Sequence, residues 1–308
     1  MVRQDDITLR REMNNNTDNS RRALILAYLR AVESYRPERE RLFDDRFSRD
    51  LMPLSSKISL LPGFRHAIVA MMEANVPGLI GDLYCRTRYI DDALDNALRD
   101  GVQRVVILGA GFDARAYRIS GIEQTHVFEL DLPEPQRLKQ TLVAQILGEL
   151  PPHVTYVPID FDRQDLGSTL AAEGFQSGLR TFFICEGVTQ YITEEAVDRI
   201  FRTIYVAAAK GSEVVFTYIQ QGIIDGTARL YVDRKMMSAV NESGTPWIFG
   251  LASSRLAEYL LQRGFELVED VGAADFQARY LKPRGRELYI YKGERVALAR
   301  IAGKEIEA

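Results

Sequence analysis

The chain has 308 residues, of which 46% are hydrophobic and 27% charged, and its formal net charge at pH 7 is −4. This composition is that of an ordinary globular protein, and the length suits either two domains or one large α/β core with an appended segment. The small negative net charge provides no general attraction for nucleic acid or anionic lipid, so neither is expected as a partner.

The N-terminal segment and the cysteine count restrict the compartment and the chemistry. Residues 1–17 are polar and charged, and no stretch of the chain reaches the roughly 18 apolar residues of a membrane span. We therefore expect a cytoplasmic protein. Cys85 and Cys185 lie far apart outside any CxxC pair, and the three histidines lack ligand-like spacing, so we expect neither a disulfide framework nor a metal site.

The first 100 residues are predicted to be helical. Within residues 21–35, Leu24, Tyr28 and Ala31 recur at helical spacing, and the preceding polar residues can cap the helix start. Later segments of this region are interrupted by prolines and contain no strand-like run. We interpret residues 1–100 as a helical lid or cover, followed by a separate domain over residues 101–308.

From residue 103 onward, short apolar runs alternate with helical patterns, which is typical of a parallel sheet with crossover helices. Two helices have clear signals: Thr193–Lys210 ends before Gly211, and Ser254–Arg263 ends before Gly264. The candidate strands are Arg104–Leu108, His126–Leu130, Thr155–Ile159, Thr181–Cys185, Glu213–Tyr218, Phe265–Glu269 and Arg295–Ile301.

A glycine turn follows the first of these strands. Gly109-Ala110-Gly111 would let the backbone turn sharply and approach a ligand, although such a turn alone is a weak motif. Asp131 ends the second strand, 20 residues beyond Gly111, which is the spacing at which an acid binds a ribose. Dinucleotide dehydrogenases and S-adenosylmethionine (SAM) methyltransferases share this arrangement.

Asp113 bears on the choice between these two classes. A dinucleotide places its pyrophosphate at this helix start, where the charge of Asp113 would repel it, whereas the same charge suits the ammonium and sulfonium groups of SAM. The residue has an equally good interpretation as a favourable acid in the first turn of a helix.

Acids also follow the third and fourth strands. Asp160 could accept a hydrogen bond from an adenine amino group while the backbone of Phe161 contacts the ring, and Glu186 follows the fourth strand on the same crevice. Three strand ends carrying acids at Asp131, Asp160 and Glu186 are hard to explain as solvated surface.

Several motifs together resemble the leucine carboxyl methyltransferase superfamily, and more closely its bacterial branch of SAM-dependent O-methyltransferases linked to polyketide-type small molecules. The resemblance covers nearly the whole chain. It is carried by Ala31 to Ser34, Leu42 to Asp45, Arg86 to Asp91, Leu108 to Arg115, Phe128 to Pro133, Cys185 to Gly187, Trp247 to Gly250 and Glu294 to Arg300.

The resemblance implies a class I methyltransferase fold, with a Rossmann-like sheet that is mostly parallel but has an antiparallel last strand, and with SAM bound by residues 101–308. It also implies a role for each of six residues. Arg86 would pair with the SAM carboxylate, Gly109 meet the amino-acid moiety, Asp131 bind the ribose, Asp160 and Phe161 the adenine, and Glu186 lie near the ammonium and sulfonium groups. Arg115 and Arg118 match the family pattern as well, and we interpret them as structural ion-pair partners.

One departure from the family bears on the acceptor. Enzymes that methylate protein carboxyl groups resemble Asp-Leu-Arg after the third strand, whereas this chain has Asp160-Phe161-Asp162-Arg163. We therefore expect a small-molecule acceptor, methylated on a carboxylate or hydroxyl oxygen, with His66 or Tyr191 as possible helpers and Tyr191 as a substrate contact. Aromatic residues that could line the acceptor pocket are Tyr84, Tyr191, Tyr218, Trp247 and Phe249.

Two other functions stay open at this point, an NAD-dependent oxidoreductase on the same sheet and a non-catalytic SAM-binding protein. The oligomeric state is left between monomer and homodimer.

Overall fold

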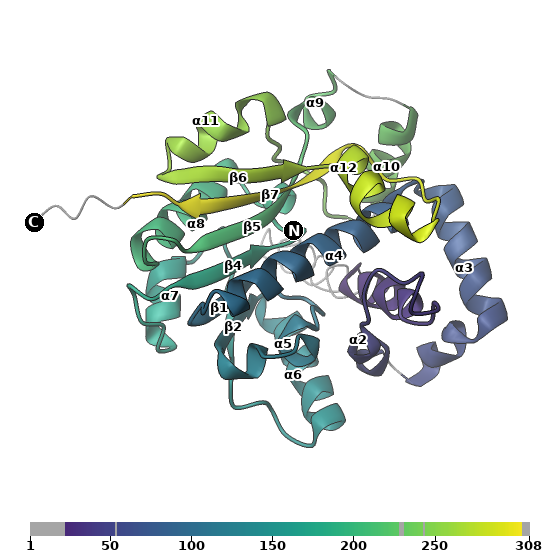
Figure 1. Cartoon of the computed structure of the whole chain (residues 1–308), viewed down its shortest axis with the longest axis horizontal. Helices are drawn as coiled ribbons and strands as arrows, with labels where there is room; N and C mark the ends of the chain where they lie inside the picture. Colours follow the sequence, from purple (N-terminus) through teal and green to yellow (C-terminus); the bar gives the residue numbers. More distant parts are fainter. Residues whose placement is uncertain (1–21, 53, 228–230, 243, 304–308) are drawn as a thin grey trace, which may run out of the picture.

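A computed structural model describes residues 22–52, 54–227, 231–242 and 244–303 of the chain (Figure 1). The predicted first helix occupies residues 22–33, and its expected cap and first residue lie outside the described part.

Seven strands form one sheet in the order β3-β2-β1-β4-β5-β7-β6. Strand β7 is antiparallel to both of its neighbours, and the other strands run parallel to one another, as the opposed arrows of β6 and β7 show (Figure 1). The predicted sheet with an antiparallel last strand is thus confirmed. The strands are β1 (Arg104–Leu108), β2 (His126–Asp131), β3 (Val154–Pro158), β4 (Thr181–Cys185), β5 (Glu213–Ile219), β6 (Phe265–Val271) and β7 (Glu294–Ile301).

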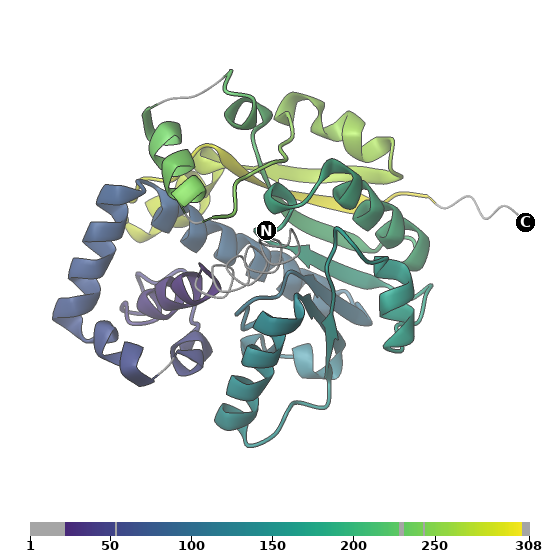
Figure 2. The same ribbon diagram turned by 180° about the vertical axis from the view of Figure 1, so that it is seen from behind.

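The apolar strands are covered on both faces. Val105 and Ile107 of β1 belong to one core cluster with helix α4 (Leu79–Arg99), while Val106 and Leu108 belong to a second. The second cluster includes α7 (Leu166–Ala172), α8 (Glu194–Ala207) and α11 (Leu256–Leu261), which cover the face seen in Figure 2. Burial on both faces explains why β1 and β4 are continuous apolar runs.

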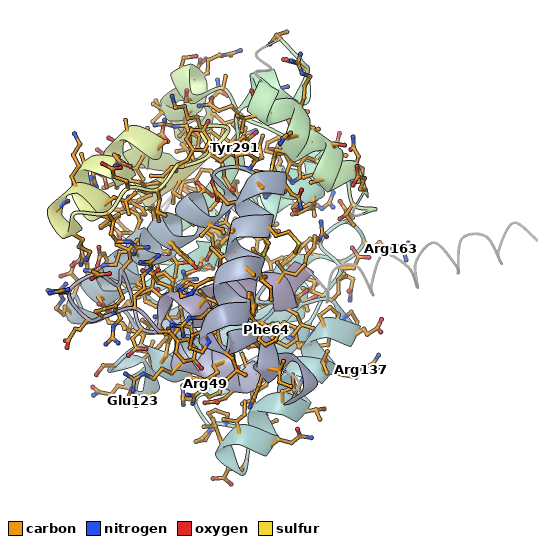
Figure 3. All side chains as sticks on the ribbon, turned by 90° about the vertical axis from the view of Figure 1, so that its right-hand side faces the viewer. Arg49, Phe64, Glu123, Arg137, Arg163 and Tyr291 are labelled. Carbon is orange, nitrogen blue, oxygen red and sulfur yellow. The ribbon has the colours of Figure 1, made fainter. Side chains whose placement is uncertain are left out.

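Further helices lie beyond the carboxyl ends of the parallel strands (Figure 1). They are residues 22–33, α2 (Arg46–Leu51), η1 (Leu54–Leu60) and α3 (Pro62–Asn75). Helix α3 has no buried residue, and Phe64 lies on its outer side (Figure 3). His66, which the sequence offered as a catalytic helper, is exposed on this helix.

The domain boundary at residue 100 stays a prediction. Helix α4 lies just before this boundary and packs against the sheet.

The remaining elements are short or connect the strands. They are α5 (Arg115–Arg118), η2 (Ile122–Gln124), α6 (Pro133–Leu147), η3 (Thr189–Tyr191), α9 (Gln221–Ile224), α10 (Tyr231–Glu242), η4 (Ser253–Arg255), α12 (Ala273–Phe276), η5 (Gln277–Leu281) and η6 (Lys282–Arg284). Of the helices described, none is both long and apolar enough to cross a membrane.

The helix predicted over 193–210 shows where sequence signals for helix ends succeed and fail. Thr193 caps α8, since its side chain accepts a hydrogen bond from the N–H of Ala196. The predicted C-terminal end is wrong, because α8 stops at Ala207. The Ala207 carbonyl accepts from Gly178 and the Ala209 N–H donates to Leu179, so the chain leaves the helix before reaching Gly211.

The predicted end of the second helix at Arg263 is also late, because α11 stops at Leu261; the turn that follows reaches Gly264, whose backbone has φ +84°. A Cβ atom at Gly264 would lie 2.2 Å from a ring carbon of Tyr205, whereas a Cβ atom at Gly174, with φ +82°, would meet nothing within 4 Å.

We predict that Gly174→Ala lowers the free energy of unfolding by roughly 1–2 kcal/mol through backbone strain. Gly264→Ala should lower the free energy of unfolding by a further ~1–3 kcal/mol, because the added Cβ atom also clashes with Tyr205. Urea unfolding of the two variants measures this difference, and equal losses would contradict it.

Candidate cofactor site

The carboxyl ends of four neighbouring strands bring the predicted residues to one edge of the sheet. Gly109 follows β1, Asp131 is the last residue of β2, and Glu186 follows β4. Asp160 lies two residues beyond β3, whose Pro158 is paired with Asp131. In open α/β sheets, ligands bind at this edge, where the strand order reverses.

The glycine turn and Asp131 are bonded to each other. Both glycines have positive φ, +67° at Gly109 and +41° at Gly111, which other residues rarely adopt. The N–H of Gly111 donates to one carboxylate oxygen of Asp131, and the N–H of Leu132 donates to the other at 2.6 Å. Burial raises the pKa of Asp131, an effect that these two N–H groups partly offset. The carboxylate is therefore held in one orientation beside the turn.

The third strand end is more open. Asp160 accepts a hydrogen bond from the N–H of Asp162 at 3.1 Å, and the Phe161 ring is buried in the second core cluster. Arg163 lies at the periphery, with its side chain 67% exposed (Figure 3). The structure thus places Arg163 at the surface, where its guanidinium pairs with Asp160 at 3.5 Å.

Glu186 is the most strongly paired of the strand-end acids. It accepts from Arg86 Nε at 3.0 Å and from Arg115 Nη1 at 2.8 Å. Burial alone would raise the pKa of Glu186, but Arg115 and Arg86 more than offset this effect, and the pKa lies below its ordinary value. Glu186 is therefore held as a carboxylate at neutral pH.

These pairs belong to a continuous buried cluster that we call the arginine network. Arg86 also contacts Asp82 at 3.1 Å and Glu294 at 2.5 Å, and Arg115 contacts Asp91 at 2.8 Å. The network consists of Arg30, Arg86, Arg115 and Arg118 with the acids Asp45, Asp82, Asp91, Asp113, Glu186 and Glu294. The interpretation of Arg115 and Arg118 as structural ion-pair partners is confirmed.

Asp113 lies just before a helix and not in its first turn, since α5 begins at Arg115. Its carboxylate accepts from the Arg115 N–H at 2.7 Å and pairs with the Arg115 guanidinium. Helix α5 has four residues, so it presents no extended dipole to a ligand. Burial would raise the pKa of Asp113, but Arg115, Arg30 and Lys139 together lower it to about 2. Its charge is therefore one member of the arginine network, and it bears on the cofactor only through the total charge of that network.

Sequence reasoning missed Asp82 and Glu294 as partners of Arg86. Asp82 precedes Arg86 by four residues on α4, a spacing that places both on one helix face and could have been noticed. Glu294 is 208 residues from Arg86, and no local pattern connects the two. The pKa of Asp82 is well above its ordinary value because of burial and the nearby Glu294, which favours its protonated form.

The structure separates the aromatic residues proposed for the acceptor pocket. Tyr84 lies in the first core cluster, and Tyr218 and Phe249 lie in the second. Tyr191 is half-buried beside Trp247 in a third cluster, with the Arg22 guanidinium 4.4 Å from the centre of its ring. Among the described residues there is no group of three potential metal ligands.

The sheet order is that of the class I methyltransferase fold which the resemblance implied. A dinucleotide-binding sheet has the strand order 3-2-1-4-5-6, whereas here the antiparallel β7 is inserted between β5 and β6. The sheet therefore differs from the one that the NAD-dependent alternative predicts.

The chain belongs to the leucine carboxyl methyltransferase family, whose family model matches residues 23–205. It is 30% identical over 256 residues to a putative SAM-dependent methyltransferase of Mycobacterium ulcerans, covering 79% of this chain and 82% of that protein. A Streptomyces coelicolor protein of the same description is 36% identical over 140 residues, which is 46% of this chain and 49% of that protein. By their names, the cofactor of these relatives is SAM, as predicted from the sequence.

Solved structures show the same fold. A DUF574 family protein from Streptomyces avermitilis superposes with a TM-score of 0.53 at 17% identity, covering 78% of this chain and 90% of that one. The structure of a putative methyltransferase from Thermobifida fusca superposes with a TM-score of 0.52 at 17% identity, covering 77% of this chain and 88% of that one.

The pairing of Asp113 predicts a pH dependence of stability. Its folded pKa of about 2 lies below the ordinary value of 3.8, so the pairing stabilises the fold above about pH 4 and is lost as the pH falls toward 2. At roughly 1.4 kcal/mol per pKa unit, Asp113→Asn should lower the free energy of unfolding by ~2 kcal/mol at pH 6 and by little near pH 2. Urea unfolding across this range measures it, and a loss that does not change with pH would contradict it.

Proposed function

We propose that this methyltransferase transfers the methyl group of SAM to an oxygen atom, of a carboxylate or a hydroxyl, on a small molecule. The observation that carries the proposal is the charge of the arginine network at the sheet edge. It contains six carboxyl groups and four guanidinium groups, and even with Asp82 protonated the carboxylates exceed the guanidinium groups by one.

The charge of SAM complements this excess. Its ammonium and sulfonium groups are cationic and its carboxylate is anionic, so the molecule carries one net positive charge at neutral pH. Buried charges are stabilised by opposite charges, and the pyrophosphate of a dinucleotide would instead add to the negative excess. The residues present therefore fit SAM and disfavour NAD.

The six predicted cofactor residues keep their roles in this proposal. Asp131, held beside the glycine turn, would bind the ribose hydroxyls through two charge-assisted bonds. Arg86 would meet the SAM carboxylate, next to the backbone of Gly109, and Glu186 would lie near the cationic groups. Asp160 and Phe161 would contact the adenine at the more open third strand end.

The bound cofactor would supply a methyl group on an already activated sulfonium leaving group. Catalysis then depends mainly on aligning the acceptor oxygen with the methyl carbon and sulfur, and no covalent nucleophile is required. The family description names a carboxyl acceptor, which supports oxygen as the target. The chain lacks the Asp-Leu-Arg run of the protein-carboxyl enzymes, and its Arg163 already pairs with Asp160, which supports a small molecule as the acceptor.

The first test is binding. In calorimetric titration, we expect heat from SAM and S-adenosylhomocysteine at micromolar concentrations and none from NAD. Radiolabelled SAM with a panel of phenols and carboxylic acids then distinguishes an enzyme from a non-catalytic SAM-binding protein. Heat from NAD without heat from SAM would overturn the proposal.

The second test compares two carboxylates that each accept hydrogen bonds in a strand-end loop. Asp131 accepts from two backbone N–H groups, and Asp162 accepts from the N–H and hydroxyl of Thr193. Asp131→Ala should weaken SAM binding by at least tenfold, since each charge-assisted bond to the ribose contributes roughly 1.5–3 kcal/mol. Asp162→Ala should leave SAM affinity unchanged, and equal affinities of the two variants would remove Asp131 from the site.

A further inference from the structure

Two cavities lie next to each other beside the turn that follows the helix over residues 22–33. The first has a volume of about 550 Å³ and is lined by Arg36, Arg39 and Glu40 on one wall and by residues 283–288 on the other. The second, of about 350 Å³, is lined by residues of the same turn and by arginines that follow it. Because Arg36 lines both cavities, we treat them as one site and call it the basic cleft.

The floor of the basic cleft is a buried ion pair. Arg286 contacts both carboxylate oxygens of Glu33, one of them at 3.1 Å, and the two side chains are 5% and 0% exposed. Glu33 also accepts a hydrogen bond from the N–H of Leu42 at 2.8 Å, and Arg36 lies 3.4 Å from it as a second arginine partner. Arg286 donates in addition to the Glu40 carbonyl at 3.1 Å. These bonds join the two walls of the first cavity.

In the second cavity, one carboxylate is shared between two arginines. Asp44 Oδ2 lies 3.1 Å from Arg41 Nη2 and 3.2 Å from Arg46 Nε. Arg49, which is labelled in Figure 3, pairs with Asp50 through two hydrogen bonds, at 3.0 and 3.2 Å. Three arginines therefore meet two carboxylates here, which leaves an excess of one positive charge.

The first cavity contains an arginine that is held by neutral groups. The Arg284 guanidinium donates to the carbonyl oxygens of Arg41 and Tyr280, at 3.3 and 3.4 Å, and within the described ranges of the chain no carboxylate pairs with it. Arg39 pairs with Glu40 at 3.4 Å. Arg284 therefore adds a full positive charge to this wall.

The basic cleft as a whole has two more guanidinium groups than carboxylates, although the net charge of the chain is −4. The carboxylates are the four paired acids and one further acid in the lining, Glu287. The seven arginines are Arg36, Arg39, Arg41, Arg46, Arg49, Arg284 and Arg286, and the paired acids are Glu33, Glu40, Asp44 and Asp50.

This excess complements a group with two negative charges. A phosphate monoester carries close to two charges at neutral pH, since its second pKa is about 6. Guanidinium groups match phosphate oxygens through paired N–H donors, and each guanidinium has five such donors. Concave cavities of roughly 300–1,000 Å³ are typical of small-molecule sites, whereas a stable protein partner would need about 800 Å² of surface.

We propose that the basic cleft binds a small molecule through a phosphate monoester group. None of its seven arginines belongs to the arginine network, and none of the six predicted cofactor residues lines it. The proposal is therefore independent of the proposed function and adds a second ligand site to the protein.

Phenyl phosphate and phenyl sulfate are matched probes, because they carry the same ring but differ in the charge of the anionic group. In calorimetric titration of the full chain at neutral pH and low salt, we expect one phenyl phosphate per chain, bound at least about tenfold more tightly than phenyl sulfate. At about pH 5, where the phosphate loses its second charge, its affinity should fall toward that of phenyl sulfate, whose own affinity should change little.

Variants of two arginines assign the binding to the basic cleft. Arg284→Gln should weaken phenyl phosphate binding by about tenfold, and Arg284→Lys, which keeps the charge, should retain most of it. Arg39 is 85% exposed, so Arg39→Gln should leave the circular dichroism unchanged and weaken binding about threefold. The matched control is Arg255→Gln, since Arg255 is 75% exposed and pairs with Glu258 at the same 3.4 Å, and it should bind like the parent protein.

The outcomes that overturn the proposal are distinct from those that overturn the proposed function. No binding of phenyl phosphate, equal affinity for phenyl sulfate, or equal affinities of the Arg39, Arg284 and Arg255 variants would contradict the phosphate site. Hexaglutamate that displaces phenyl phosphate and binds more tightly would assign the cleft to an acidic protein partner instead. Phenyl phosphate binding by a protein that binds no SAM would support this site while contradicting the proposed function.

Discussion

The fold depends on the requirement that a charge removed from water must have an opposite charge beside it. Glu186 follows β4 directly and accepts hydrogen bonds from Arg86 of α4 and Arg115 of α5, so three segments meet at one carboxylate. Arg30 extends the same cluster to the helix over residues 22–33. Its guanidinium also donates a hydrogen bond to the Phe112 carbonyl at 2.6 Å. A shift of any one segment would leave an uncompensated buried charge, and this cost fixes the position of the helices beyond the strands.

The same requirement joins structure to function, because the groups that hold the helices in place are those proposed to receive the cofactor. The Arg86 guanidinium fixes α4 against β7 through Glu294, and it is also the predicted partner of the SAM carboxylate. Binding would therefore redistribute contacts that already exist. Preorganisation of this kind reduces the cost of ordering side chains when a ligand binds.

The sheet could be predicted from sequence because burial on both faces leaves continuous apolar runs in β1 and β4, and all seven candidate strands are present. The end of α8 could not be predicted in this way, because the hydrogen bonds that end the helix before Gly211 involve the distant segment around Gly178. Nor did the sequence show that Asp113 pairs with Arg115, two residues further on, so that its charge counts only as part of a larger network. The positions of site residues could be predicted where these residues lie at the ends of strands. The partners of each side chain could not, because they come from segments that are distant in sequence.

The position of β7 in the sheet has a consequence for synthesis. Strand β7 lies between β5 and β6, and its first residue, Glu294, completes the pairing of Arg86. On the ribosome, the first five strands are therefore synthesised well before this residue emerges. Until then β5 exposes an unpaired edge, the kind of surface on which incomplete chains associate. Because the closing contacts join residues far apart in sequence, folding is expected to be slow, and a chain whose synthesis stops before β7 would have neither a closed sheet nor a complete cofactor edge.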